Sequence, residues 1–322
     1  MPLAAGPRLM PASSWAYQLQ HIDAATIAGC PADVVVIDTS PDGDWRNAFT
    51  ADQVARMKTR QNGAPNKKLI AYMSIGEAEE QRFYWQGDWV RGGRKTERTP
   101  KWLHALNDQG WTGNWKVRFW EPEWQSKIIG EAGCFVDRII EQGFDGVYLD
   151  IIDAYDYWLQ SDRDAARRPT AAEEMVAFVA RIGEHARRTH GKTDFAIIPQ
   201  NGEGLLVFPQ YRAAISAIGK EDIFFDQFGK ANAKPRVRPR PEQGGDHGEG
   251  VEDVMGHLRL ALADRIPVLS VEYLRDWPDD QPKITTALAR MRASGFIPHF
   301  GRRDLGSLCA TTLPDHSAAL TT

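Results

Sequence analysis

Carboxylate side chains stand at the points where short apolar segments of the chain end. The apolar segment 147–149 runs directly into Asp150, and Asp153 follows three positions later. A buried strand with a carboxylate at its C-terminal end is typical of how a parallel α/β sheet presents catalytic groups. The polar residues that follow predicted strands in this way are Asp38, Glu77, Asp150, Gln200, Asn201, Glu221, Glu272 and Asp304.

A set dominated by carboxylates indicates cleavage of glycosidic bonds. Two carboxyl groups on either side of a pocket suffice, because one stabilises or attacks the anomeric carbon while the other protonates the leaving oxygen. The first group must stay ionised. The second must keep its proton near neutral pH, through burial or a neighbouring charge.

Other chemistries have weaker support in the sequence. There is no HxH or HExxH zinc motif and no GxSxG nucleophile motif. Cys30, Cys134 and Cys309 form no CxxC pair and cannot all be paired within the chain, so we expect no metal and no cofactor. Cys134, within a predicted helix, is interpreted as a small core residue. An oxygen-only magnesium or calcium site, serving a metal-dependent hydrolase or lyase, stays an alternative.

Composition narrows the range of partners. The 322 residues are 42% hydrophobic and 25% charged, with a net charge of -4, which is ordinary for a soluble enzyme and gives no case for binding nucleic acid or an anionic membrane. Apolar runs fall short of the roughly 18 residues that a spanning helix needs. Many of the 11 tryptophans neighbour Gly, Asp or Arg and are predicted to lie outside the core. We expect one or two to stack on sugar rings and most to fix a long loop to the barrel.

The elements that must position these groups alternate between strands and helices. Strands are predicted at 15–19, 34–37, 69–73, 147–149, 195–199, 214–218, 267–271 and 296–300. Helices are predicted at 51–60, 122–142, 171–189, 251–264 and 284–294. Because these strands are apolar on both faces and alternate with helices, the pattern predicts one (β/α)₈ barrel. An open doubly wound sheet is the alternative, but the chain has no glycine-rich phosphate loop.

The predicted domain is residues 15–310. Residues 1–14 show no convincing signal-peptide core and are expected to be disordered or processed, and 311–322 to form a tail. The segments 81–114 and 229–250 are predicted as long loops. Loops of this length in a compact domain are usually functional.

Five motifs in order along the chain carry a family resemblance. They are YMSIGEAE at 72–79, FWEPEWQ at 119–125, GFDGVYLDIID at 143–153, IPQNG at 198–202 and GKEDIF at 219–224. Together they resemble glycoside hydrolase family 114, whose defining activity is endo-α-1,4-polygalactosaminidase. The resemblance runs from about Trp15 to Asp304. It implies a (β/α)₈ barrel that cleaves α-1,4-linked amino-sugar polysaccharide, by retention, in an extracellular or periplasmic location.

The same resemblance implies roles for individual residues. Asp150, within an intact GFDxVxxD pattern, matches the nucleophile, and Glu221 matches the general acid/base. The residues after Glu221 depart from the polygalactosaminidase pattern, and Glu272 is the alternative partner for Asp150. The residues expected to bind substrate are Asp38, Tyr72, Glu77, Asp153, Gln200, Asn201, Glu272 and Tyr273.

Two further expectations concern the mouth of the barrel. Asp38 and Glu77 are predicted to line the pocket floor, where they bind sugar or pair with Arg302 or Arg303. The expected partner is a polysaccharide or oligosaccharide, with no nucleic acid and no membrane; the sequence predicts no oligomeric state. A carbohydrate-binding barrel without hydrolytic activity is the alternative function.

Overall fold

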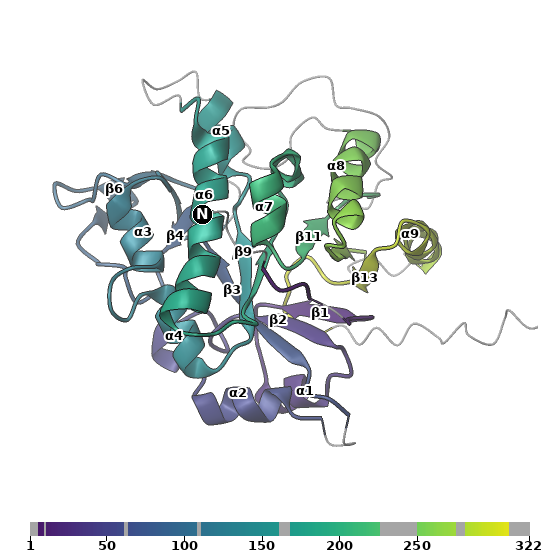
Figure 1. The fold of residues 1–322 in the computed structure, drawn as a ribbon. Coiled ribbons are helices and arrows are strands. Elements are labelled where there is room, and N and C mark those ends of the chain that lie inside the picture. Colours follow the sequence, from purple (N-terminus) through teal and green to yellow (C-terminus); the bar gives the residue numbers. More distant parts are fainter. Residues whose placement is uncertain are drawn as a thin grey trace, which may run out of the picture.

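The computed structural model describes residues 6–9, 11–60, 64–107, 111–160, 168–225, 250–274 and 281–308. Within these ranges, eight strands run parallel to one another at the centre of the molecule (Figure 1). They are β1 (Trp15–Gln18), β2 (Val34–Ile37), β3 (Lys68–Ser74), β9 (Gly146–Asp150), β10 (Ala196–Pro199), β11 (Ile218–Glu221), β12 (Val268–Glu272) and β13 (Ile297–Phe300).

These strands close into a ring. Five of them pair in the order β1-β2-β3-β9-β10, and three pair in the order β11-β12-β13. A parallel bridge between Gln200 and Gly219 joins β10 to β11. On the other side β13 contacts β1, and the Trp15 indole donates a hydrogen bond of 2.9 Å to the Ile297 carbonyl. The predicted (β/α)₈ barrel is therefore confirmed.

Helices cover the outside of the ring and connect successive strands (Figure 1). Thr50 begins one of them with a capping box, in which its hydroxyl accepts from the Gln53 N–H and the Gln53 side chain accepts in return. The connecting helices are α1 (Ala24–Gly29), α2 (Ala51–Lys58), α4 (Phe135–Gln142), α6 (Ala171–Glu184), α7 (Pro209–Ala214), α8 (Val251–Ala263) and α9 (Gln281–Ala293). Their buried faces pack on the strands and form the larger of two cores.

The smaller core fills the inside of the barrel and is rich in aromatic side chains. The ring centroids of Trp15, Tyr17 and Tyr148 lie between 5.3 and 6.2 Å from one another. Gly219 faces this group, and a Cβ atom there would lie 2.0 Å from the Tyr148 hydroxyl. The barrel interior thus requires a glycine on β11 to accommodate the tyrosine.

The segment predicted as one long loop at 81–114 contains regular structure, so that prediction is wrong in part. Its strand β7 (Leu103–Leu106) joins β8 (Asn114–Val117) and β4 (Glu77–Glu79) in an antiparallel sheet. A second pair, β5 (Val90–Arg91) and β6 (Arg94–Lys95), forms a hairpin. This small sheet extends the molecule beside α3 (Pro122–Ile128) (Figure 1).

The tryptophans of this region are mostly core residues, contrary to the expectation that they lie outside it. Trp89, Trp102 and Trp124 are buried and contact one another in turn, edge to face with a centroid separation of 5.2 Å for the first pair and tilted at 4.9 Å for the second. The Trp124 indole donates to the Ile75 carbonyl at 2.9 Å. Since each such ring buries a large apolar area, the cluster fixes the 81–114 segment to the barrel, as the sequence led us to expect.

The predicted helix at 122–142 is two helices. α3 ends at Ile128 and α4 begins at Phe135. Between them Gly130 and Gly133 have φ values of 115° and 72°, which L-residues rarely adopt, and the helical hydrogen bonding stops there. Cys134, expected inside the helix, is the residue that precedes α4.

The predicted sixth strand at 214–218 is also displaced. Pro209 begins α7, which runs to Ala214, and β11 begins only at Ile218. Residues 215–217 form a buried connection between α7 and β11. Their apolar character led to the wrong prediction of a strand. As a result Glu221 is the last residue of β11 rather than part of the following loop.

The remaining boundaries fall partly outside the described residues. Of the predicted loop at 229–250 the structure describes only Gly250, before α8. Near the N-terminus, Gly6 and Leu9 donate backbone hydrogen bonds to Ala213 and Ser216, so residues 6–9 pack against the barrel. The proposed domain start at residue 15 stays a prediction. Among the described helices, none has the length and apolar character that crossing a membrane requires.

Candidate active site

Three neighbouring strands end in unusual backbone geometry at one mouth of the barrel. Ile151, Asn201 and Asp222 follow the ends of β9, β10 and β11, with φ values of 56°, 57° and 52°. Residues other than glycine seldom adopt this conformation, and it is often found at functional sites. It turns the chain sharply away within two residues of each strand end, so that Asp150 and Glu221 remain at the ends of β9 and β11.

The carboxyl group of Asp150 is held at both oxygens. The Tyr72 hydroxyl donates to Oδ2 at 2.6 Å, and the Ile151 backbone N–H donates to Oδ1 at 2.8 Å. Burial raises the pKa of Asp150 to about 7, and the charges of Glu221 and Glu77 add to the effect, while the two hydrogen bonds oppose it. This group therefore changes its charge near neutral pH.

Glu221 is held in a matching way. The Tyr273 hydroxyl donates to Oε2 at 2.8 Å, and the Asn201 amide donates to Oε1 at 2.9 Å. The guanidinium of Arg303 lies 4.8 Å from the centroid of the Tyr273 ring. Two tyrosines thus hold the two carboxyl groups: Tyr72 lies on β3, the strand beyond β9, and Tyr273 directly follows β12, the strand beyond β11.

Both carboxyl groups face the same space. Only β10 lies between β9 and β11, so their backbones are roughly 10 Å apart at the usual strand spacing. The Tyr148 ring lies inside the barrel near both carboxyl groups. Its pKa is raised well above the ordinary value by burial and then by the charges of Glu221 and Asp150.

Asp222 was not singled out as a site residue from the sequence. It accepts a hydrogen bond from the guanidinium of Arg303. Burial and the charge of Glu221 raise the pKa of Asp222 to about 6, against the effect of Arg303. Arg303 was expected to pair with Asp38 or Glu77, and its pairing with Asp222 corrects that prediction.

Glu272, the alternative partner for Asp150, points elsewhere. Its Oε1 accepts from the Phe224 N–H at 2.8 Å and its Oε2 from the Phe225 N–H at 3.2 Å. The side chain is fully buried, and burial raises its pKa to about 8. These contacts tie β12 to the segment that follows Glu221. The geometry therefore favours Glu221 over Glu272 as the partner of Asp150.

Asp38 belongs to a buried ion cluster. The guanidinium of Arg82 donates to both oxygens of Asp38, at 2.9 and 2.7 Å, and to both oxygens of Glu79, at 2.7 and 3.0 Å. The expected pairing of Asp38 with Arg302 or Arg303 is thus wrong. Arg82 lies in the long 81–114 segment, 44 positions from Asp38, and no local pattern marks it.

Glu77, on β4, and Gln200, directly after β10, are each held by a neighbouring side chain. Both oxygens of Glu77 accept from the Asn107 amide, at 2.9 and 3.0 Å, and burial raises the pKa of this carboxyl. Gln200 Oε1 accepts from the Tyr17 hydroxyl at 3.1 Å. Asp153 is buried directly before α5 (Ala154–Gln160). Asn107 is a further residue that the sequence reasoning missed.

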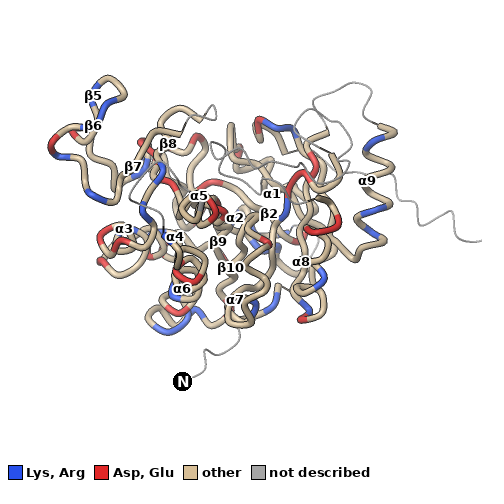
Figure 2. Tube along the Cα trace, turned by 90° about the horizontal axis from the view of Figure 1, so that it is seen from above, with Lys and Arg blue, Asp and Glu red and all other residues tan. Residues whose placement is uncertain are grey.

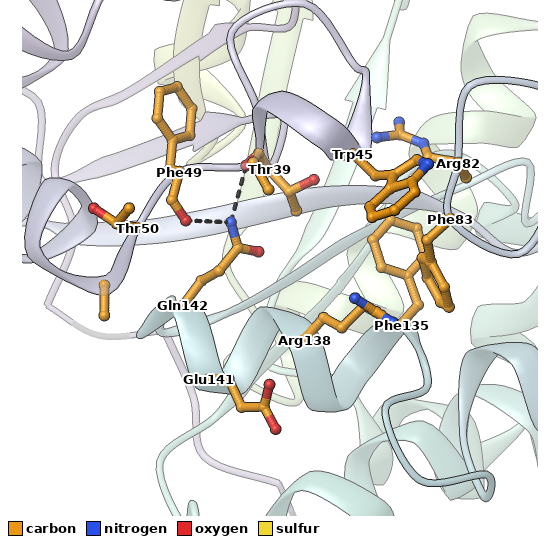
Figure 3. A pocket seen from close by; sticks show the side chains of 12 residues that line it. Thr39, Trp45, Phe49, Thr50, Arg82, Phe83, Phe135, Arg138, Glu141 and Gln142 are labelled. Atoms are coloured by element: carbon orange, nitrogen blue, oxygen red, sulfur yellow. Dashed lines mark hydrogen bonds between the residues drawn. The ribbon is translucent and has the colours of Figure 1, made fainter.

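A separate hollow lies outside the barrel. A cavity of about 260 Å³ opens between α2 and α4, where Gln142 donates to the carbonyls of Thr39 and Phe49 at 3.0 and 2.8 Å (Figure 3). Trp45, Phe83 and Arg138 also line it. It contains none of the carboxylates at the C-terminal strand ends, so the candidate site is the barrel mouth.

Seen from above, acidic residues lie among the elements near α5 (Figure 2).

Comparison with known sequences shows a match along nearly the whole chain. The model of glycoside-hydrolase family GH114 matches residues 3–315. An uncharacterized protein of Methanocaldococcus jannaschii is 37% identical over 301 residues, covering 90% of this chain and 75% of the relative. An uncharacterized protein of Thermotoga maritima is 32% identical over 301 residues, covering 92% of this chain and 82% of the relative.

Solved structures share the same barrel. The glycoside hydrolase domain of PelA from Pseudomonas aeruginosa has a TM-score of 0.63 and 20% identity, covering 92% of this chain and 98% of that domain. Ega3 of Aspergillus fumigatus, in complex with galactosamine, has a TM-score of 0.61 and 16% identity, covering 95% of this chain and 99% of its own. At these identities the likeness is one of fold.

Proposed function

Because this chain belongs to glycoside hydrolase family GH114, we propose that it cleaves an α-1,4-linked, galactosamine-type polysaccharide with retention of configuration. The chain is a glycoside hydrolase; the polymer, the stereochemistry and the residue roles are the proposal. The observation that carries it is the pair of carboxyl groups, Asp150 and Glu221, held at one barrel mouth. The galactosamine in the complex of the similar Ega3 structure supports an amino sugar as substrate.

In the proposed reaction Asp150 is the nucleophile and Glu221 the acid/base. Asp150 forms a bond to the anomeric carbon while the glycosidic C–O bond breaks and Glu221 transfers its proton to the leaving oxygen. Water then attacks the glycosyl-enzyme, its proton passes to Glu221, and Asp150 is released. Tyr72 stabilises the ionised form of Asp150 by hydrogen bonding, and Tyr273 with Asn201 orients Glu221.

The charge at the mouth supports a cationic substrate. Glu77 and Asp222 lie close enough to the catalytic pair for their charges to interact with it. A mouth lined by carboxyl groups attracts a polymer that carries ammonium groups and repels anionic glycans. We propose an extracellular or periplasmic location, which is what membership of this family implies.

The test is hydrolysis of defined α-1,4-linked galactosamine oligosaccharides, with product masses and the anomer formed first read by NMR. Asp150→Asn and Glu221→Gln should each lower kcat/KM by at least about 100-fold. Asp304→Asn is the matched control, since Asp304 also follows a barrel strand but its side chain is 60% exposed and pairs with Arg302. The product formed first should keep the α configuration of the substrate. Oligosaccharide binding without turnover, equal in wild type and Asp150→Asn, would instead identify a binding protein.

A further inference from the structure

A second group of chemically active side chains lies away from the barrel mouth, between α4 and the end of α6. Cys134 Sγ, Asp137 Oδ1 and His185 Nε2 lie within 4.8 Å of one another. His185 Nε2 is 3.8 Å from the Cys134 sulfur and 2.7 Å from Asp137 Oδ1. His190 Nε2 lies 2.7 Å from the same carboxylate oxygen. Three groups that commonly bind metals therefore converge on a small volume, and His190 adjoins them through its contact with the carboxylate.

The backbone brings the two histidines together by an unusual device. After α6 the chain continues as a π-helical turn, His185–Thr189, closed by a hydrogen bond from the His190 N–H to the His185 carbonyl. In a regular α-helix residues five apart diverge by about 140° around the axis. In this wider turn they share a face, and their ring centroids are 5.0 Å apart. Such π-turns occur frequently at functional sites.

The loop before α4 orients the other two groups. Gly133, at φ 72°, donates its N–H to Asp137 Oδ2 at 3.1 Å, so Oδ1 is left to face the histidines. The Arg138 guanidinium fixes the Gly133 carbonyl at 2.9 Å. Hydrogen bonds of this kind, behind the binding atoms, are what metal sites use to orient their ligands. Here α4 lies beside the lower end of α6 (Figure 1).

We propose that Cys134, Asp137, His185 and His190 form a zinc-binding site that fastens α4 to the end of α6. Zinc prefers four ligands of this kind, sulfur, imidazole nitrogen and carboxylate oxygen, in a tetrahedron. At bond lengths of about 2.0 to 2.3 Å, such ligand atoms lie roughly 3.3 to 3.8 Å apart. The Cys134–His185 separation of 3.8 Å already fits, and the two histidine–carboxylate contacts lengthen by well under 1 Å. His190 is not among the ligand atoms that all lie within 4.8 Å of one another, so its ring moves toward Cys134 and His185 when the ion binds.

The surroundings suit a closed, structural site. Cys134 is 2% exposed and Asp137 8% exposed, so these ligands are shielded from water. The His190 side chain is 28% exposed and offers a path for the ion to enter. Four protein ligands leave no open position for substrate, so the bound ion stabilises the fold rather than taking part in hydrolysis.

The test uses the full-length protein, freed of metal by a chelator and then titrated with Zn²⁺ and, separately, with Co²⁺. Wild type should bind one equivalent of Zn²⁺ and show a higher Tm when it is bound. The Co²⁺ form should show tetrahedral visible bands and a sulfur-to-cobalt charge-transfer band. Cys134→Ser should remove the charge-transfer band, and His190→Ala should weaken Zn²⁺ binding by about 10- to 100-fold.

Cys30→Ser is the matched control, because Cys30 is also a buried free cysteine but lies at the end of α1. It should keep both the stoichiometry and the charge-transfer band. His190→Ala, at the most exposed position, keeps the test decisive if Cys134→Ser does not fold. A wild-type protein without the charge-transfer band, or with Zn²⁺ affinity that neither substitution changes, would overturn the proposal and leave the cluster as a hydrogen-bonded contact.

Discussion

Removal of the Tyr72 hydroxyl should make the enzyme more sensitive to acid. Tyr72 donates the 2.6 Å hydrogen bond that stabilises the charged form of Asp150. A hydrogen bond to a charged group contributes about 1.5 to 3 kcal/mol. One pKa unit corresponds to about 1.4 kcal/mol. Because Asp150 is only half-buried, we take the lower end of this range, so Tyr72→Phe should raise the pKa of Asp150 by about one unit.

The sign of the effect on activity depends on the role of Asp150. If Asp150 is the nucleophile, its ionised form is the active one, and kcat/KM falls as the pH drops below the pKa of about 7. Raising that pKa by about one unit lowers the ionised fraction at pH 6 by about tenfold and leaves it nearly unchanged above pH 9. If Asp150 were the general acid, kcat/KM would instead fall as the pH rises through 7.

The assay is kcat/KM from about pH 4 to pH 10 on a galactosamine oligosaccharide, for wild type and Tyr72→Phe. Tyr273→Phe is the matched control, since its hydroxyl contacts Glu221 instead of Asp150. It should leave the acid limb near its wild-type position. The pKa of Asp150 can also be read directly by NMR of its labelled carboxyl carbon. An acid limb at the same pH in wild type and Tyr72→Phe would refute the reasoning.

Three further predictions concern buried groups. Glu272→Gln should cost about 1 to 3 kcal/mol of unfolding free energy in urea, because one acceptor for a backbone N–H is lost. It should keep far more activity than Glu221→Gln. Burial raises the folded-state pKa of Glu272 to about 8. The protonated carboxyl group therefore contributes stability that is fully present below about pH 4.5 and is lost as the pH rises through 8. Glu272→Gln should flatten this decline in unfolding free energy between about pH 5 and pH 9. Arg82→Met should cost about 3 to 5 kcal/mol in the same urea measurement, because two buried carboxylates lose their cation. Gly219→Ala should lower the Tm or prevent folding, because its Cβ atom would lie 2.0 Å from the Tyr148 hydroxyl; an unchanged melting curve would contradict the packing described for the barrel interior.

The barrel could be predicted because its strands are apolar on both faces. β9 is a clear case, since a buried run ends directly on Asp150 and the next residue turns away. β11 was misplaced for a physical reason. It contains Lys220, whose ammonium group is buried against Glu203 at 2.9 Å, so the strand looks like a polar loop in the sequence. A charge that is neutralised by a partner from a neighbouring connection cannot be recognised from local pattern alone.

The contacts that the sequence could not supply join residues that are distant along the chain. Arg82 meets Asp38 across 44 positions, and His190 meets Asp137 across 53. In the second case the π-helical turn also changes which side chains share a face, so a search at the ordinary helical spacing of three or four does not pair the two histidines. Both clusters become visible only when helices and strands are placed side by side.

The arrangement of strands around β10 explains how the two carboxyl groups can act as a pair. β3 lies beyond β9, and β12 lies beyond β11. Around the barrel mouth the order is therefore Tyr72 on β3, Asp150 on β9, the strand β10, Glu221 on β11, and Tyr273 directly after β12. Each carboxyl group therefore receives a phenol hydroxyl from the outer side. A sugar above β10 would meet both from the inner side. Tyr72 lies within β3, Asp150 and Glu221 end β9 and β11, and Tyr273 directly follows β12, so four neighbouring segments fix this symmetry. Burial and the neighbouring charges raise the pKa of Asp150 to about 7, which makes its ionisation sensitive to pH near neutrality.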